Sequence, residues 1–121
     1  MKEDVAMSYV EIWTFRTVGQ DPPSALPDVT GFDVEATDGH IGKVDEETND
    51  LNSGLVVDTG WWIFGKKRII PAGMIDRVDR DDEKVHLKLT KDQVKEAPDF
   101  EAARRHDEDY RKNVGDYYGR Q

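Results

Sequence analysis

The chain has 121 residues, and 26 acidic against 17 basic residues give it a formal net charge of −9. This balance argues against a nucleic-acid binder and against docking on anionic lipid, because both need a surplus of Lys and Arg on one face. The sequence has no cysteine, which excludes a disulfide framework and a Cys-ligated metal. An acidic N-terminus and the lack of an apolar run of about twenty residues predict a cytoplasmic protein without a membrane span.

Residues 1–28 are predicted to be an N-terminal extension that ends in a linker rich in proline and small polar residues. Within it, residues 9–15 are rich in strand-forming side chains. Ala6, Tyr9, Val10 and Trp13 also have helical spacing, so the pattern leaves strand and helix open. We expect an added strand or a segment that packs on the following domain.

Residues 29–98 show a series of short alternating segments separated by turns, the pattern of an all-β domain. Asp38-Gly39 is a hairpin signal, and Gly42 inside the next segment indicates a bulge or a close backbone approach. In the last segment Val85, Leu87 and Leu89 are expected to point inward. The predicted strands are 32–36, 40–45, 55–58, 68–70, 74–78 and 84–89, with an acidic loop over 46–54.

A short helix is predicted directly after the last strand. Thr90 and Gln93 have the spacing of a capping box, and Pro98 ends the helix. Five or six short strands with one short C-terminal helix and polar extensions predict an all-β fold, a small β-barrel or rolled sheet. The final region, 99–121, is charged; a helix over 101–112 would have few apolar residues, so we expect a tail that is mobile or docks on a partner.

An ordered series of short motifs resembles the PRC-barrel family, the domain shared by the photosynthetic reaction-centre H subunit and the bacterial ribosome maturation factor. The resemblance extends through residue 98, and the C-terminal Tyr117-Tyr118-Gly119 is similar to the tails of stand-alone bacterial PRC-barrel proteins. The main motifs are Thr30-Gly31-Phe32-Asp33-Val34, Asp38-Gly39-His40-Ile41-Gly42-Lys43-Val44-Asp45, Leu55-Val56-Val57-Asp58-Thr59-Gly60, Phe64-Gly65-Lys66, Ile70-Pro71-Ala72 and Leu89-Thr90-Lys91-Asp92-Gln93-Val94-Lys95.

The resemblance implies a PRC-type barrel that serves as a scaffold for protein contacts and has no catalytic residues. The membrane helix of the H subunit and the extra N-terminal barrel of the maturation factor have no counterpart here, so neither of those functions carries over. The three histidines, His40, His86 and His106, have no spaced partner that would indicate catalysis. The acidic loops at 45–50 and 79–83 fail the spacing of an EF-hand, and we expect no metal and no cofactor.

Residues 61–68 are the most informative segment for function. In an extended chain Trp61 and Ile63 share one face while Trp62 and Phe64 share the other, and a small barrel has room for one pair. The second pair either anchors a protein interface or is covered by the chain's own ends. We expect a protein-interaction or assembly module that forms a homodimer. The interface residues predicted are Trp61, Trp62 and Phe64, supported by Trp13, Tyr117 and Tyr118.

The same segment permits an alternative function, an RNA- or ribosome-associated factor. Aromatic side chains stack on bases, and Lys66, Lys67 and Arg68 would meet phosphates. Three basic residues in a protein of net charge −9 provide only a weak electrostatic attraction for RNA.

Overall fold

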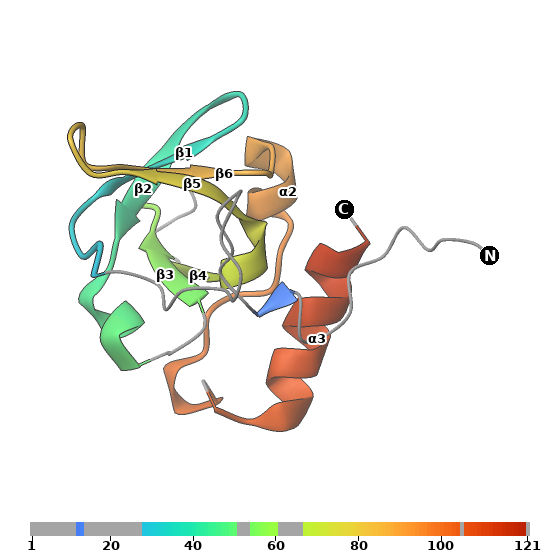
Figure 1. The fold of residues 1–121 in the computed structure, drawn as a ribbon. Helices are drawn as coiled ribbons and strands as arrows, with labels where there is room; N and C mark the ends of the chain where they lie inside the picture. The colour runs from blue at the N-terminus through green and yellow to red at the C-terminus, as the bar shows by residue number, and fades with distance from the viewer. Residues whose placement is uncertain (1–11, 14–27, 51–53, 61–66, 105, 121) are drawn as a thin grey trace, which may run out of the picture.

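The computed structural model describes residues 12–13, 28–50, 54–60, 67–104 and 106–120. Its six strands are the six predicted from the sequence, with small shifts at the ends (Figure 1). They are β1 (Asp33–Ala36), β2 (Gly39–Val44), β3 (Gly54–Asp58), β4 (Lys67–Pro71), β5 (Ile75–Asp79) and β6 (Lys84–Leu87).

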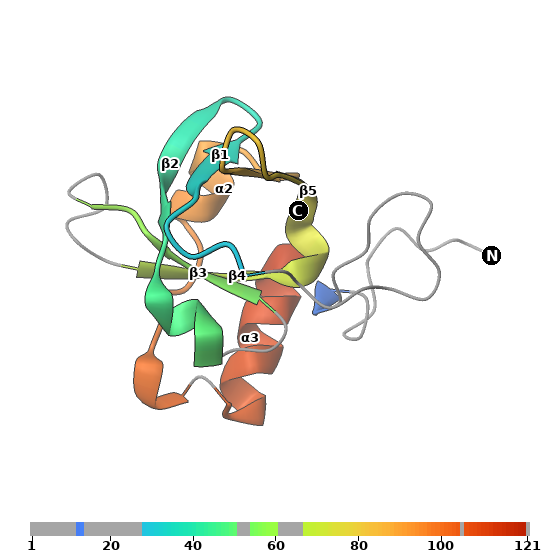
Figure 2. The same ribbon diagram turned by 60° about the vertical axis from the view of Figure 1, so that its left-hand side comes forward.

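The strands form one sheet in the order β4-β3-β2-β1-β6-β5. Neighbouring strands are antiparallel except β1 and β6, which run parallel. The sheet curls into a half-barrel, and β4 and β5 are the two edges of the hydrogen-bonded order (Figure 2). A single 3₁₀ turn, η2 (Ala72–Met74), connects these two edge strands. The prediction of a small all-β barrel is therefore confirmed at the level of a curled six-stranded sheet.

The hairpin between β1 and β2 shows why its glycines are needed. The turn itself is Thr37-Asp38, and Gly39 of the predicted turn signal begins β2 opposite Ala36. The pairing shifts from Val34↔Gly42 to Glu35↔His40, which is a bulge on β2. A Cβ on Gly42 would lie 2.2 Å from the backbone oxygen of Asp58, well inside contact distance. The predicted bulge and close approach at this position are both present.

The core is mostly aliphatic, and consecutive residues of β3 and β4 are buried, so both faces of these two strands are covered. Val85, Leu87 and Leu89 are buried as predicted, while Lys88 is exposed. β3 and β4 contribute branched residues that are fully enclosed, among them Val56 and Ile69. The predicted acidic loop after β2 begins with a 3₁₀ turn, η1 (Glu46–Asp50). Burial of branched side chains on neighbouring strands is what fixes the register of the sheet.

The predicted helix after β6 is α2 (Lys91–Lys95), and its capping box is complete. The hydroxyl of Thr90 accepts a hydrogen bond from the N–H of Gln93 at 3.2 Å, and the Gln93 side chain accepts one from the N–H of Thr90 at 2.8 Å. Val94 is buried, so this short helix closes part of the barrel. The cap and the burial of Val94 are two of the contacts that hold this helix.

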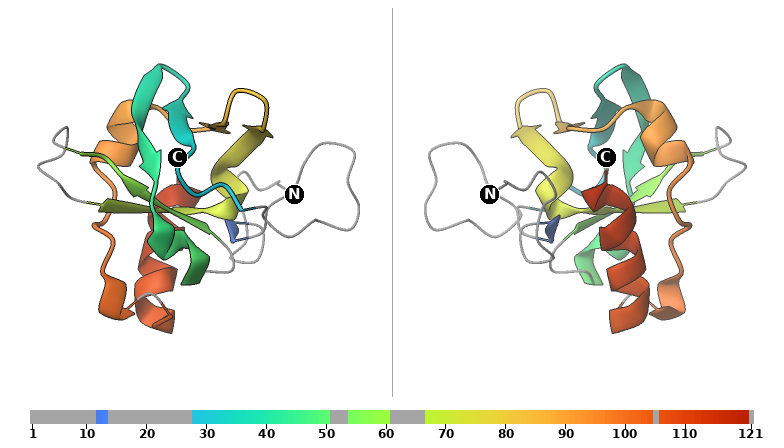
Figure 3. Two further views of the ribbon diagram at one scale, coloured as in Figure 1. Left: turned by 90° about the vertical axis from the view of Figure 1, so that its left-hand side faces the viewer. Right: turned by 90° about the vertical axis from the view of Figure 1, so that its right-hand side faces the viewer.

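The C-terminal region differs from the expectation of a mobile or partner-bound tail. After the 3₁₀ turn η3 (Ala102–Arg104), it forms the helix α3 (Glu108–Gly119), which packs against β4 of the same chain (Figure 3). Tyr110, Val114 and Tyr118 are its buried stripe at i, i+4 and i+8. A helix over 101–112, as weighed from the sequence, would begin too early, because Ala102–Arg104 form the 3₁₀ turn instead. The actual helix begins after the N-cap Asp107, whose side chain accepts from the N–H of Tyr110.

The N-terminal extension is described only at Ile12 and Trp13, both of which are buried in the core. The choice between strand and helix for residues 9–15 falls largely outside the described residues. In the described part of the chain, no helix is long and apolar enough to cross a membrane.

Candidate interaction surface

The aromatic segment predicted as an interface, residues 61–64, lies outside the described residues, but the strands on either side of it are described. β3 ends at Asp58 and β4 begins at Lys67, and these two residues are paired across the ladder. The stretch 59–66 therefore connects the adjacent ends of two antiparallel strands. Trp61, Trp62 and Phe64 belong to this connection, beyond the last described pair of the β3–β4 ladder.

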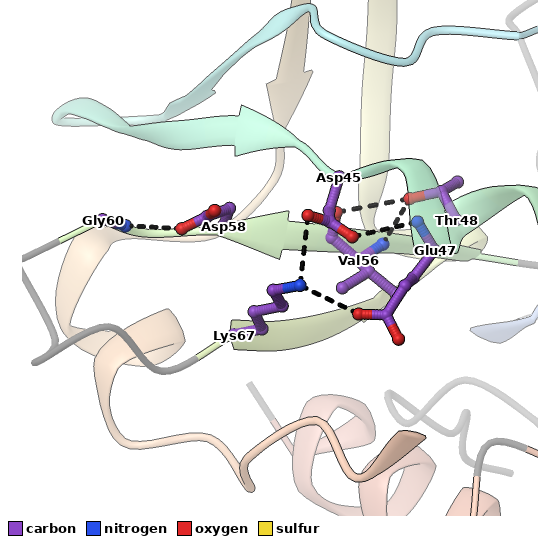
Figure 4. A network of polar contacts seen from close by, with 7 residues as sticks. All are labelled: Asp45, Glu47, Thr48, Val56, Asp58, Gly60 and Lys67. Carbon is purple, nitrogen blue, oxygen red and sulfur yellow. Dashed lines mark hydrogen bonds and ion pairs between the residues drawn. The ribbon is translucent and has the colours of Figure 1, made fainter. Parts of the chain in front are cut away.

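A surface hollow of about 490 Å³ opens at this end of β3. It is lined by residues 40–43 of β2 and by residues 58–60. The carboxylate of Asp58 accepts a hydrogen bond from the N–H of Gly60 at 2.8 Å, which turns the chain as it leaves the strand (Figure 4). Gly60, which lines the hollow, is the last described residue before Trp61 in the sequence.

Lys67, at the start of β4, belongs to a polar network rather than to a free basic patch (Figure 4). Its Nζ lies 3.2 Å from the carboxylate of Asp45 and 2.9 Å from that of Glu47. The hydrogen bond to Glu47 raises the pKa of Lys67, so the amine stays charged. The hydroxyl of Thr48 accepts the N–H of Val56 at 2.7 Å and holds η1 against β3. The network ties the loop after β2 to β3 and β4.

Arg68 is buried and connects three parts of the chain. Its Nε donates to the carbonyl of Val94 at 3.1 Å, and Nη2 donates to the carbonyl of Lys95 at 2.9 Å. These carbonyls are at the end of α2, where backbone acceptors lack helical partners. Nη1 forms an ion pair with Asp99. The guanidinium thus caps α2 and holds the segment that leads to α3.

These contacts bear on the alternative of RNA binding through Lys66, Lys67 and Arg68. Lys67 is neutralised by two carboxylates and Arg68 is 5% exposed. Lys66 lies outside the described residues. Phosphate contacts need cations that reach solvent, and neither described cation does so as an uncompensated charge. The basic run therefore serves the barrel's own structure at two of its three positions.

The supporting aromatic residues pack inside the chain. Trp13 is 6% exposed, and the guanidinium of Arg111 lies 4.0 Å from the centre of its ring, a cation–π contact between the N-terminal extension and α3. Tyr118 is 1% exposed, and burial raises its pKa. Tyr117 is partly buried and donates its hydroxyl to the carbonyl of Gln93 at 2.5 Å. In this structure the three residues join the chain's ends to the barrel.

Tyr110 anchors α3 to the segment before it. From the sequence alone, it is only one residue of a small apolar helix face. Its hydroxyl donates to the carbonyl of Asp99 at 2.7 Å and accepts the N–H of Glu101 at 3.1 Å. Burial raises the pKa of Tyr110. Spacing at i, i+4 and i+8 with Val114 and Tyr118 is the signal that indicates this helix face.

Two pairs of titratable side chains join β1 and β2. Nδ1 of His40 lies 2.7 Å from the carboxylate of Glu35, and Nζ of Lys43 lies 2.7 Å from that of Asp33. Among the residues that the structure describes, no group of three or more His, Asp or Glu side chains is arranged to hold a metal ion. These pairs link β1 and β2.

Comparisons with protein-family models and with curated protein sequences find no match for this chain.

Proposed function

We propose that this protein is a non-enzymatic, PRC-type barrel that acts as a protein-interaction or assembly module and associates with itself. The observation that carries the proposal is the pairing of Asp58 with Lys67. This register assigns Trp61, Trp62 and Phe64 to the connection between two strands, and the described residues just before them, 58–60, line a hollow in the surface. Connections carry binding residues more often than the strands that position them.

The aromatic connection has the composition of an interface anchor. Large aromatic side chains dominate the energetics of protein interfaces, and they are placed where a rigid scaffold presents them. Here the scaffold is the β3–β4 ladder, whose start is fixed by the Lys67 network and by the buried Arg68. Trp13 and Tyr118 are buried within the chain. The residues that we predict to contact a partner are therefore Trp61, Trp62 and Phe64.

The polar contacts of the described residues support a scaffold. Arg68 caps α2, Lys67 holds η1, and the His40–Glu35 pair joins two strands. Each is a contact between neighbouring elements. His40 also lines the hollow, but the contact of its ring is with Glu35 across the β1–β2 pair rather than with a nucleophile. The RNA alternative gains no support, because Lys67 and Arg68 are engaged within the barrel.

The test compares the full chain with Trp62→Ala by light scattering over a concentration series. We expect the variant to associate at least about tenfold more weakly, because truncating an aromatic anchor costs 2 kcal/mol or more. Circular dichroism and thermal melting establish that the variant is folded. A folded Trp62→Ala protein whose mass follows that of the wild-type chain at every concentration would contradict the proposed anchor.

A further inference from the structure

Only one of the two sheet edges is left without backbone pairing in the described part of the chain. At the β4 edge, Phe100 donates its N–H to the carbonyl of Lys67 at 2.9 Å, and Arg68 forms an antiparallel bridge with Asp99. α3 packs against the same strand. β5 pairs only with β6 among the described strands. Unpaired strand edges are templates for pairing with another chain, so β5 is the edge to consider.

The hydrogen-bond pattern of β6 shows which way its backbone groups point. Asp33 of β1, the partner of Lys84, donates its N–H to the carbonyl of Glu83 at 2.9 Å. In a parallel ladder this directs the backbone groups of Glu83 and Val85 toward β1. Lys84 and His86, which alternate with them, therefore direct theirs to the other side, toward β5.

The same alternation continues into β5. Lys84 and His86 lie opposite Asp79 and Arg77, so these two β5 residues are the hydrogen-bonding positions of the β5–β6 ladder. Val78 lies between them and directs its N–H and C=O away from β6. Its side chain is partly buried against the core. The outer edge of β5 thus presents a backbone donor and acceptor at Val78.

The charges around Val78 are antisymmetric along the chain. The sequence reads Asp76-Arg77-Val78-Asp79-Arg80, so each charge has one of opposite sign at the same distance on the other side of Val78. Asp76, Arg77 and Arg80 are exposed, and Asp79 is partly exposed. When such a strand meets a copy of itself in antiparallel orientation, centred on Val78, every charge faces its opposite.

We propose that a second copy of this chain pairs with the first along β5, antiparallel and with a two-fold axis at Val78. The two Val78 residues exchange backbone hydrogen bonds, and Arg77 of each copy lies opposite the second copy's Asp79. Asp76 and Arg80 face one another in the same way. The two curled sheets then form one continuous sheet across the axis, which is an isologous contact.

Other symmetric registers are disfavoured by charge. A two-fold antiparallel pair places one residue opposite its own copy. Centring on Arg77 sets arginine against arginine, and centring on Asp79 sets aspartate against aspartate, both of which are destabilising. Of these three centres, Val78 is the one that brings no like charges together. Its backbone N–H and C=O groups also point outward from the sheet. Arg77 lies 3.8 Å from Asp79 of its own chain, so the two copies would build one four-charge cluster.

The contact is small. β5 has five residues, and such a strand buries far less than the roughly 1,200–2,000 Å² of a stable interface. The pairing therefore sets orientation and register, and we expect the association to be weak, concentration-dependent and weakened by salt.

The inference rests on the proposed self-association and is tested on the full chain by light scattering at about 50 mM salt. Val78→Pro removes the outward N–H and keeps the β5–β6 ladder, since that N–H does not face β6. Arg77→Asp places two carboxylates opposite two others. We expect both variants to associate at least about tenfold more weakly than wild type. Lys112→Asp, the same charge change at an exposed position of α3, is the matched control and keeps the wild-type behaviour.

A mixing experiment tests the register directly. Arg77→Asp and Asp79→Arg each place like charges opposite one another in a pair of identical copies. Mixed together, they bring Asp opposite Arg at both positions, and we expect association to recover. Because the chain has no cysteine, a mixture of Arg77→Cys and Asp79→Cys gives a second reading. These positions face one another in a non-hydrogen-bonded pair, whose Cα atoms are about 4.5 Å apart, within disulfide range, so oxidation should trap a covalent dimer that Lys112→Cys does not form.

The outcomes separate this inference from the proposed function. If folded Val78→Pro and Arg77→Asp associate as wild type does, or if the mixed Arg77→Cys and Asp79→Cys variants trap no dimer, the β5 contact is wrong, and the aromatic anchor is judged by Trp62→Ala. If Trp62→Ala has no effect while the β5 variants do, the aromatic anchor is wrong and the β5 contact stands. A wild-type chain that stays monomeric throughout the series overturns the β5 contact.

Discussion

Arg68 on β4 and Asp99 after α2 form an ion pair and a backbone bridge that together join the barrel to the C-terminal extension. The Arg68 side chain is 6% exposed and that of Asp99 is 44% exposed, so the pair is half sheltered from water. The other guanidinium nitrogens are used by the carbonyls of Val94 and Lys95. One buried residue therefore holds the end of α2, the edge of β4 and the approach to α3.

Replacing Arg68 by Met should lower the free energy of unfolding by about 3 kcal/mol, because the α2 carbonyls lose the hydrogen bonds of the guanidinium and Asp99 loses its ion pair with Arg68. Lys67→Met is the matched control on the neighbouring residue. Its ion pairs are one-third exposed, so the loss should be about 1 kcal/mol or less. Urea unfolding of both variants checks the difference, and equal losses would contradict the role assigned to Arg68.

Removing the hydroxyl group should change the free energy of unfolding differently at two tyrosines of α3. The hydroxyl of Tyr118 is buried and has no hydrogen-bond partner among the described residues, so Tyr118→Phe should be neutral or stabilising by about 1 kcal/mol. Tyr110→Phe removes two hydrogen bonds and should destabilise by about 1–2 kcal/mol. Thermal unfolding of the two single variants measures the contrast. A larger loss for Tyr118→Phe would be inconsistent with its unpaired hydroxyl.

Alkaline pH should destabilise the protein through Tyr118. Burial raises its pKa in the folded state above the unfolded value. Its contribution is fully present below the unfolded pKa of about 10. Above that pH the unfolded chain loses the proton while the folded chain keeps it, so stability falls by up to about 1.4 kcal/mol per pH unit. Chemical unfolding between pH 8 and about 11 should show this decline in wild type and a shallower one in Tyr118→Phe.

Gly42→Ala should destabilise the sheet strongly. The added Cβ would lie 2.2 Å from the backbone oxygen of Asp58, and backbone on a paired strand has little room to move. We expect a loss of about 3 kcal/mol or more, at the upper end of overpacking effects. Gly31→Ala is a control without a steric clash, because no atom lies within 4 Å of its Cβ, although its positive φ adds some strain. Equal melting temperatures for the two variants would contradict the steric explanation.

The strands could be predicted from the sequence because each is a short alternating or branched segment with a clear turn at its end. Asp38-Gly39 marks the first hairpin, and Thr90 with Gln93 marks the helix. Local signals of this kind depend on neighbours a few residues away, and all of them are visible in one sequence. The close approach of Gly42 to β3 was also indicated, since glycine inside a strand marks such contacts.

The C-terminal helix was misplaced because its stability comes from tertiary contacts. Its apolar stripe consists of Tyr110, Val114 and Tyr118, two of them amphipathic, and a helix with that stripe is marginal until it packs. The role of Arg68 was equally hidden. Its partners are the carbonyls of Val94 and Lys95, more than 25 residues away and without any side-chain signature. From the sequence, Arg68 is therefore expected in a basic surface patch. In the fold it is buried and links three segments of the chain.

The most direct test of the account is the solution mass of the full chain, measured by light scattering over a concentration series at low salt. The account predicts a weight-average mass that rises above that of one chain as concentration increases, and that returns toward it when salt is added. A chain that keeps the mass of a single copy across the whole series, at every salt concentration, would contradict self-association.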